Sequence, residues 1–477
     1  MRPEWLLVTA DDLRFEREQL RDEGRDVSTL EEEFDELVDG LDPEGHGPIP
    51  VEDRVDVVDS VAATDAAVEN RDRVNDLLDR ARELPVRENY TYHEPNGLEA
   101  IRAARPEKTP YTDSAPTGEE LRDHLYGAWL GRCAGCLLGK PVEGWMTEKS
   151  WAVFRAQENF PLERYVEADV PEAVITEYDV DPEGVFRSAL APGDTGMPED
   201  DDTNYTVAGL DLLASHGIDF DSGDVARYWM RNVPILRTHT AERVAYRNFA
   251  NLVSPPHSAT HRNPYREWIG AMIRADPYGY VALGDPTLAA ELAWRDARVS
   301  HVKNGIYGSM WVAAMLAAAP SVEGPRELLT AGLAEIPEES RLTEAVEDVL
   351  GWDEEGIAYG AALDRLHRRW DQTNYHHWCH TISNAEIVCI GLLWGGGELG
   401  PSICRTVQAG FDTDSSGATV GSLVGMLVGA EALSAQWVDP LDDTIETGID
   451  GYSRVAISDL SGTTVGLVED RRHGAVD

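Results

Sequence analysis

The stretch AGFDTDSSGATVGSLVGMLVGA, residues 409–430, joins an acidic turn to a small-residue segment with glycine at every fourth position. Gly417, Gly421, Gly425 and Gly429 form this series. Residues four apart share one face of a helix, so one face of the segment is bare backbone. A bare face lets a neighbouring helix approach closely. The stretch therefore predicts a closely packed helix whose N-terminal end carries acids.

A second segment, GRCAGCLLGKPVEGW at residues 131–145, repeats the four-residue glycine spacing. Its helical pattern breaks at Pro141, and Glu143 stands just past the break. Cys133 and Cys136 form a lone CxxC with no second pair nearby, which favours packing over a zinc or redox site. Taken alone, the segment also fits a packing helix followed by a solvated acid.

The rest of the chain predicts an all-α protein, because Ala/Leu/Gly-rich helical segments alternate with polar loops and strand signals are sparse. An acidic helical extension is expected over residues 1–115, and a main domain over 116–477. A Pro/Ser/Thr-rich linker divides them, and Thr117 with Glu120 suggests a capping box. The clearest predicted helices are 121–138, 207–215, 287–297, 307–319, 383–393 and 417–432.

The charge balance excludes some classes of function. The chain has 87 acids and 41 bases, a net charge of −46, and only four of the bases are Lys. Nucleic-acid binding requires clustered cations, and anionic lipid would repel such a surface. An acidic, Lys-poor chain with an ordinary core suggests adaptation to high salt, where repulsion is screened. With neither a signal peptide nor a membrane-spanning stretch apparent in the sequence, a cytoplasmic location is expected.

A second acidic cluster lies in PEDDDTNYTVAGLDLL, residues 198–213, directly before another apolar helix. One helix cap explains one acid, whereas adjacent aspartates repel each other unless a cation holds them. Two unrelated caps remain an alternative. Both clusters together favour a metal site, and oxygen ligands without His or Cys favour Mg²⁺, Mn²⁺ or Ca²⁺ over zinc. Five or six such ligands suffice for two ions.

The motifs GxxxG…LGxPxE, xDDT and GxDTD(S/T)…GxxxGxxxG occur in that order over about residues 120–435. This combination resembles the ADP-ribosylglycohydrolase family. The resemblance implies an orthogonal all-α bundle that holds two Mg²⁺ or Mn²⁺ ions. It also implies an enzyme that cleaves an N- or O-glycosidic bond to ADP-ribose. It also implies that the substrate is an ADP-ribosylated protein or a small ADP-ribosyl compound.

Matched position by position, the resemblance implies both metal ligands and catalytic residues. Glu143 corresponds to the glutamate of LGxPxE and is the candidate general base or acid, and Asp202 is the second catalytic candidate. The implied metal ligands are Asp200, Asp201, Asp202, Asp412, Asp414 and Ser415. Two positions depart from the family: Asp200 replaces a usual Ser or Thr, and Cys136 a frequent Asp.

Substrate contacts match less closely. IGAMIR, residues 269–274, loosely resembles the family's substrate loop and makes Gly270, Ala271 and Arg274 candidates. His301 agrees with a family histidine. Arg262, Arg266 and Arg274 could supply positive potential to a phosphate or form ion pairs with nearby acids.

The segment HHWCHT, residues 376–381, leaves three interpretations open. His376 and His380 could share a helix face as zinc ligands. His380, the substrate candidate of this segment, could instead form a wall beside the nucleobase with Asn384 near it. Plain packing is the third interpretation.

Two rival functions also remain open at this point. A binuclear phosphohydrolase would suit the acidic clusters but usually has His ligands and a basic clamp. A metal-stabilised ADP-ribose-binding protein without turnover would fit the departures at Asp200 and Cys136.

Overall fold

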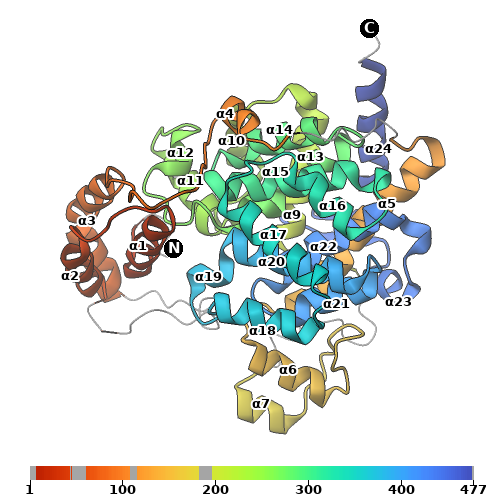
Figure 1. The fold of residues 1–477 in the computed structure, drawn as a ribbon, viewed down its shortest axis with the longest axis horizontal. Coiled ribbons are helices and arrows are strands. Elements are labelled where there is room, and N and C mark those ends of the chain that lie inside the picture. The colour runs from red at the N-terminus through yellow and green to blue at the C-terminus, as the bar shows by residue number, and fades with distance from the viewer. Residues whose placement is uncertain (1–6, 43–44, 46–60, 108–114, 182–195, 475–477) are drawn as a thin grey trace.

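The computed structural model describes residues 7–42, 45, 61–107, 115–181 and 196–474. Figure 1 shows a body built from packed helices. The sheet of the described residues is a short two-stranded hairpin. The hairpin pairs β1 (Thr444–Glu446) with β2 (Arg454–Ala456) in antiparallel register. The predicted all-α class is confirmed.

The helices follow one another along the whole described chain. Their bounds are α1 Ala10–Asp22, α2 Glu31–Leu41, α3 Val61–Ala81, α4 Leu98–Ala103, α5 Gly118–Gly139, α6 Thr147–Ala156, α7 Glu172–Tyr178, α9 Asp201–His216, α10 Ser222–Asn232, α11 Thr240–Ala250, α12 His257–Thr260, α13 Asp276–Val281, α14 Pro286–Ala297, α15 Lys303–Ala318, α16 Pro325–Leu333, α17 Arg341–Glu354, α18 Tyr359–Arg369, α19 Tyr375–Cys379, α20 Thr381–Gly395, α21 Leu399–Gln408, α22 Thr413–Val428, α23 Ala435–Val438 and α24 Ile457–Gly474. Short 3₁₀ turns include η3 Lys140–Val142 and η6 Ile269–Arg274.

The predicted helices correspond to α5, α9, α14, α15, α20 and α22. Two local expectations were wrong. The last helix ends at Val428, because Gly429 has a positive φ of 80° that breaks the helix. Thr117 is the N-cap of α5, but its side chain makes no capping hydrogen bond, so the capping box does not form.

Helices α5 and α22 pack antiparallel, backbone against backbone, at the centre of the body (Figure 1). A Cβ added at Gly135 would lie 1.9 Å from the carbonyl oxygen of Gly417, and one at Gly421 would lie 2.0 Å from that of Gly131. Only glycine permits this approach. The C-terminal end of α5 is thereby held against the N-terminal end of α22.

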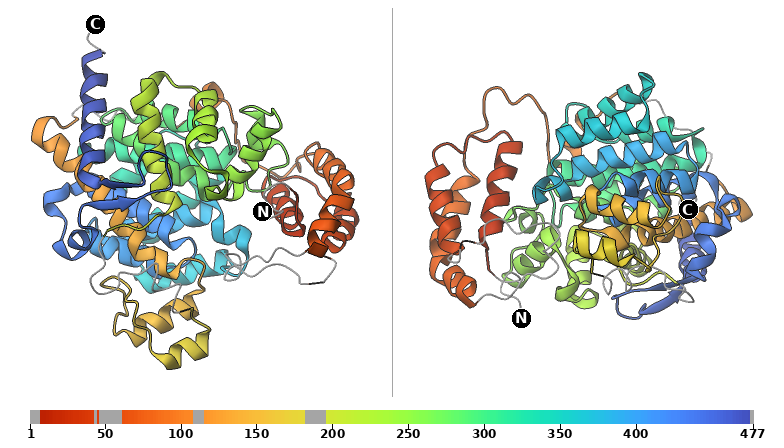
Figure 2. Two further views of the ribbon diagram at one scale, coloured as in Figure 1. Left: turned by 180° about the vertical axis from the view of Figure 1, so that it is seen from behind. Right: turned by 90° about the horizontal axis from the view of Figure 1, so that it is seen from below.

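The N-terminal helices α1, α2 and α3 lie together at one side of the body (Figures 1 and 2). They share a small apolar core of their own, while Phe15 of α1 joins the main core. Buried ion pairs also join the two parts: Arg266 donates to Glu16 and to Glu23, both at 2.6 Å. The extension is therefore docked through charged as well as apolar contacts.

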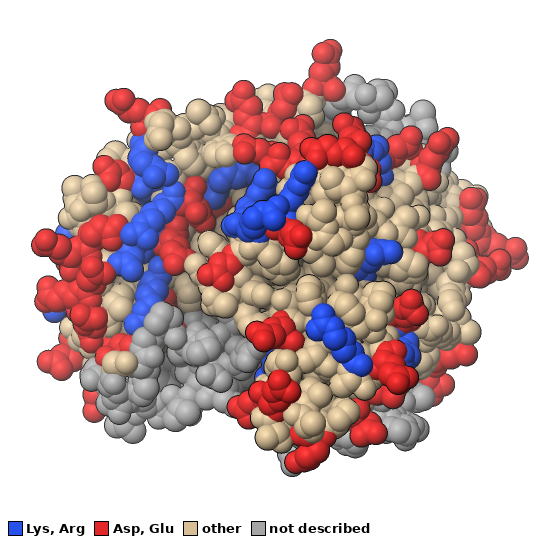
Figure 3. All heavy atoms as spheres, turned by 60° about the horizontal axis from the view of Figure 1, so that its bottom comes forward, with Lys and Arg blue, Asp and Glu red and all other residues tan. Residues whose placement is uncertain are grey.

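Acidic side chains are spread over the face in Figure 3, with Lys and Arg side chains among them. Elsewhere in the described chain, arginines also form ion pairs with acids, such as Arg80 with Asp76 at 2.9 Å. Among the described residues, none of the helices is long and apolar enough to cross a membrane.

Candidate active site

Three chain segments meet where α5 ends and α9 and α22 begin. The hydroxyl of Thr413 donates to the carbonyl of Gly139 at 2.9 Å, which ties α22 to the end of α5. The hydroxyl of Ser415 donates to Oδ2 of Asp202 at 2.9 Å, which ties α22 to the start of α9. Two helix N-termini, with their partial positive charge, therefore face one group of carboxylates.

Asp200 combines a helix-capping role with an ion pair. It is the N-cap of α9, and its Oδ1 accepts from the backbone N–H of Asp202 at 2.9 Å. Its Oδ2 accepts from Nζ of Lys140 at 2.6 Å. Burial acts to raise the pKa of Asp200, but the Lys140 ammonium lowers it on balance. The extra acid at this position is thus compensated by a lysine within the same site.

A fully buried arginine binds Asp202 through its backbone oxygen and its carboxylate. Arg132 of α5 donates to the backbone oxygen of Asp202 at 2.9 Å and contacts its Oδ1 at 3.3 Å. The same guanidinium donates to Asp276 at 2.9 Å and to the carbonyl of Ile273 at 2.7 Å. These bonds orient Asp202, whose Oδ2 accepts from the hydroxyl of Ser415.

Asp412 and Asp414 contribute the carboxylates of the second cluster. Asp412 is 5% exposed, and its Oδ2 accepts from the Cys379 thiol at 3.8 Å. Asp414 is 2% exposed, and its Oδ1 is buried with no hydrogen-bond partner. A buried carboxylate oxygen without a partner is costly, so this atom indicates a place for a cation.

The pKa shifts of these carboxyl groups also indicate a place for a cation. Desolvation, followed by the charge of Asp414, raises the pKa of Asp202 and of Asp412 well above the usual range. Desolvation, followed by the charge of Asp200, raises the pKa of Asp414 to about 7. Desolvation also raises the pKa of Asp201. Close carboxylates therefore hold protons unless a cation replaces them.

Glu143 follows η3 and lies beside these acids. The residue is exposed to solvent at the edge of the carboxylate cluster. Desolvation first, and the charge of Asp414 second, raise its pKa well above the usual range. A carboxyl group with a raised pKa is a better proton donor to a leaving group than an acid that is already ionised, and its conjugate base can accept a proton.

Two groups of ligand atoms in this region are close enough to hold an ion. One is formed by Asp200, Asp201 and Asp202, and the other by Cys136, Asp200 and Asp414, each with its ligand atoms within 4.8 Å of one another. Together with the unpartnered oxygen of Asp414, the donor set fits a divalent cation. The structure thus brings the metal candidates and Glu143 together.

The candidates of the substrate loop lie in η6, which adjoins the carboxylate site where Arg132 donates to the carbonyl of Ile273. Arg274 donates to Asp296 at 2.6 Å, to Ser300 at 3.1 Å and also to Glu242. A Cβ added at Gly270 would lie 2.4 Å from Oε1 of Glu242. The cation of Arg274 is therefore already neutralised.

Ala271 and His301 belong to the same buried region. Ala271 is fully buried in the main core. Nδ1 of His301 lies 2.8 Å from Oγ of Ser300, while its Nε2 is buried without a partner. Burial, followed by the charge of Arg274, lowers the pKa of His301 well below its usual value, so the ring is neutral.

The other arginines considered as phosphate ligands also form ion pairs. Arg262 donates to Asp79 at 2.8 and 3.1 Å, and Arg266 is bound by Glu16 and Glu23. All of these acids belong to the N-terminal extension. Of the two interpretations of this segment, the contacts fit internal ion pairing.

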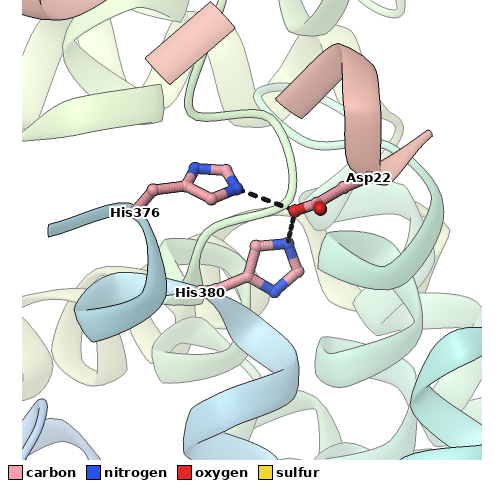
Figure 4. Close-up of side chains that lie close together, drawn as sticks. All are labelled: Asp22, His376 and His380. Carbon is pink, nitrogen blue, oxygen red and sulfur yellow. Dashed lines mark hydrogen bonds and ion pairs between the residues drawn. The ribbon is translucent and has the colours of Figure 1, made fainter. Parts of the chain in front are cut away.

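His376 and His380 both point toward Asp22, the last residue of α1, as Figure 4 shows. Nε2 of His376 lies 2.9 Å, and Nε2 of His380 3.9 Å, from the same Asp22 oxygen. Nδ1 of His376 accepts from the Trp268 indole at 3.0 Å, and Nδ1 of His380 accepts from the N–H of Ile382 at 3.1 Å. Because both Nδ1 atoms accept hydrogen bonds, the ring protons lie on Nε2. The Nε2–H of His376 donates to Asp22, whereas Nε2 of His380 is buried without a hydrogen-bond partner. Zinc would require unprotonated Nε2 atoms on both rings.

Sequence reasoning missed three charged residues at or near the site: Lys140, Arg132 and Glu242. Burial, followed by the neighbouring Arg274, sets the pKa of Glu242 at about 7, with burial dominant. Only for Lys140 did the sequence hold a signal, because lysine is scarce in this chain and stands here inside the LGxPxE motif.

A family model described as ADP-ribosylglycohydrolase matches residues 117–467. The chain belongs to the ADP-ribosylglycohydrolase family, as its all-α fold and motif order predicted. A solved structure of an ADP-ribosylglycohydrolase-related protein complex is similar over 74% of this chain and 99% of that chain, with 19% identity and a TM-score of 0.45. No curated protein sequence matches the chain.

Proposed function

We propose that the protein is a divalent-metal-dependent hydrolase that cleaves a glycosidic bond to ADP-ribose or a related ribosyl nucleotide. Its substrate is an ADP-ribosylated protein or a small ADP-ribosyl compound. Family membership supports the reaction class. The observation that carries the metal requirement is the convergence of two acidic helix N-termini around the unpartnered, buried oxygen of Asp414.

The donor set supports two Mg²⁺ or Mn²⁺ ions held by Asp200, Asp201, Asp202, Asp412, Asp414 and Ser415. When bound, such ions hold sugar hydroxyls and lower the pKa of a bound water. Arg132 and Lys140 position the carboxylates of Asp202 and Asp200. The carboxylates also stabilise the positive charge that develops on the ribose ring during bond cleavage.

Glu143 is the proposed acid–base residue. It is exposed to solvent beside the carboxylates, and desolvation and the charge of Asp414 raise its pKa. A proton on its carboxyl oxygen can pass to the leaving group, and the resulting carboxylate can then take a proton from water. No described contact assigns substrate binding to Gly270, Ala271, Arg274, His301 or His380, and such roles remain part of the proposal.

The test is a panel of ADP-ribosylated proteins and ADP-ribosyl compounds, assayed with Mg²⁺ or Mn²⁺ in molar KCl. Release of free ADP-ribose supports the proposal. Glu143→Gln should lower turnover by about two to four decades. The matched control is Glu148→Gln, which changes an exposed glutamate of α6 and should leave turnover unchanged.

The same panel tests the two rival functions. Release of inorganic phosphate would indicate a phosphohydrolase, and tight binding without products would indicate an ADP-ribose-binding protein. The basic residues nearest the carboxylates, Lys140 and Arg132, are already paired with acids, which favours glycoside cleavage over phosphoryl transfer.

The organisation of the chain is proposed as well. Residues 1–115 form an accessory helical extension, and residues 116–477 form the catalytic domain. The acidic surface is proposed to be an adaptation to high salt.

A further inference from the structure

Cys136 stands at the candidate metal centre, at the last turn of α5. The residue is fully buried, and its sulfur lies within 4.8 Å of ligand oxygens of both Asp200 and Asp414. Its neighbour Gly135 packs directly against Gly417 of α22. The close helix contact therefore sets this sulfur beside carboxylates that come from two other segments.

The surroundings of Cys136 are not those of a packing cysteine. Its sulfur belongs to one group of potential ligand atoms with Asp200 and Asp414. Cys133, one turn earlier on α5, is equally buried but belongs to no such group among the described residues. The two cysteines of the CxxC thus lie in different environments.

The dimensions suit a shared ion. A zinc–sulfur bond is about 2.3 Å and a zinc–carboxylate bond about 2.0–2.2 Å, so ligands of one ion lie up to roughly 4.4 Å apart. The ligand atoms of Cys136, Asp200 and Asp414 lie within 4.8 Å of one another, so at most a small shift brings them within this limit. Independently, Oδ1 of Asp414 is buried and unpartnered, which indicates that a ligand belongs at this position.

We propose that Cys136 is a direct ligand of one divalent ion, which makes that position a mixed thiolate–carboxylate site. This proposal rests on the metal centre of the proposed function and specifies its selectivity. Thiolate ligands favour softer ions, so this position prefers Mn²⁺, Co²⁺ or Zn²⁺ over Mg²⁺. On binding, the S–H bond breaks, a sulfur–metal bond forms, and the proton leaves to the solvent.

The test is a Co²⁺ titration of the metal-free protein in molar KCl, followed by absorption spectroscopy and by calorimetry. A cobalt–thiolate bond produces an intense charge-transfer band in the near ultraviolet, which carboxylates alone do not produce. The band should appear in the wild-type protein and in Cys133→Ser, and should be absent in Cys136→Ser. Cys379→Ser is the second control, because the Cys379 thiol contacts Asp412.

The outcomes separate the two proposals. Calorimetry without any Co²⁺ binding would overturn the metal centre itself. Binding without the band, or a band lost only in Cys379→Ser, would overturn the role of Cys136 and leave the centre intact. If Cys136→Ser does not fold, X-ray absorption of the zinc-loaded wild type decides: a sulfur neighbour at about 2.3 Å is expected, and oxygen neighbours alone would refute the proposal.

Selectivity gives a second readout on the folded variant. Cys136→Ser should lower the ratio of Zn²⁺ affinity to Mg²⁺ affinity by about tenfold or more, because a hard hydroxyl replaces a soft thiolate. An unchanged ratio would contradict the proposal.

Discussion

Replacing Gly421 with alanine tests whether the contact between α5 and α22 holds the body and the site together. The added Cβ would lie 2.0 Å from the carbonyl oxygen of Gly131, whereas ordinary contacts begin at 3.4 Å. The two helices must therefore separate by about 1.4 Å locally, because both contacting groups are backbone. A gap of about 0.5–1 Å already removes a quarter to a half of a van der Waals contact.

The expected free-energy change follows from two opposing effects. Alanine gains about 1 kcal/mol over glycine in a helix interior, and overpacking a rigid core costs about 1–3 kcal/mol or more. Because no flexible side chain can yield here, we take the upper cost of about 3 kcal/mol and expect Gly421→Ala to destabilise the protein by about 2 kcal/mol. The matched control is Gly462→Ala in α24, where an added Cβ meets nothing within 4 Å. This control should stabilise the protein by about 0.5–1 kcal/mol.

Urea unfolding at constant molar KCl measures both variants against the wild type through their midpoints. The affinity for Mn²⁺ should also fall in Gly421→Ala, since α22 begins with the proposed ligands. A midpoint for Gly421→Ala equal to or above that of the wild type would refute the close backbone contact and the argument built on it.

Three further predictions concern the metal centre, the docked extension and the surface. Asp202→Ala combined with Asp412→Ala should abolish Mg²⁺ and Mn²⁺ binding in calorimetry without unfolding the protein, since it relieves repulsion; unchanged affinity would place the ions elsewhere. Asp22→Asn should lower stability by about 1 kcal/mol at pH 7, from the loss of a charged hydrogen bond at a partly exposed site. Burial would raise the pKa of Asp22, but His376 holds this pKa well below the unfolded value of about 3.9. The loss of stability should therefore shrink as the pH falls below about 4. An equal loss at pH 7 and pH 3 would count against the hydrogen bond between Asp22 and His376. The melting temperature should rise steeply between about 0.1 and 2 M KCl as the screening length falls from about 10 Å to below 3 Å, and a flat profile would contradict the salt adaptation.

Most of the helical architecture was predictable, because its signals are local. The glycine series of α22 and the paired aspartates before α9 and α22 are readable from short stretches. Helix period and N-terminal acids depend on neighbours within about four residues, so these elements need no tertiary information. The end of α22 at Val428 was missed because it depends on the positive φ of Gly429.

The pairing of charges was not predictable, because the partners are far apart in a chain rich in acids. Lys140 and Asp200 are 60 positions apart, Arg266 and Glu16 are 250 apart, and His376 is 354 positions from its partner on α1. With 87 acids available, composition does not select the partner of any cation.

By itself, the sequence determined the helical class, the bare helix faces and the candidate metal carboxylates. These properties follow from the spacing of residues along single helices. Only the tertiary structure decided that Cys136 lies among the carboxylates, that Lys140 neutralises Asp200, and that Arg274 pairs with Asp296 and Glu242. These outcomes depend on which segments the packing of α5 against α22 brings together. Contacts between distant segments are set by the folded backbone as a whole, and no local pattern encodes them.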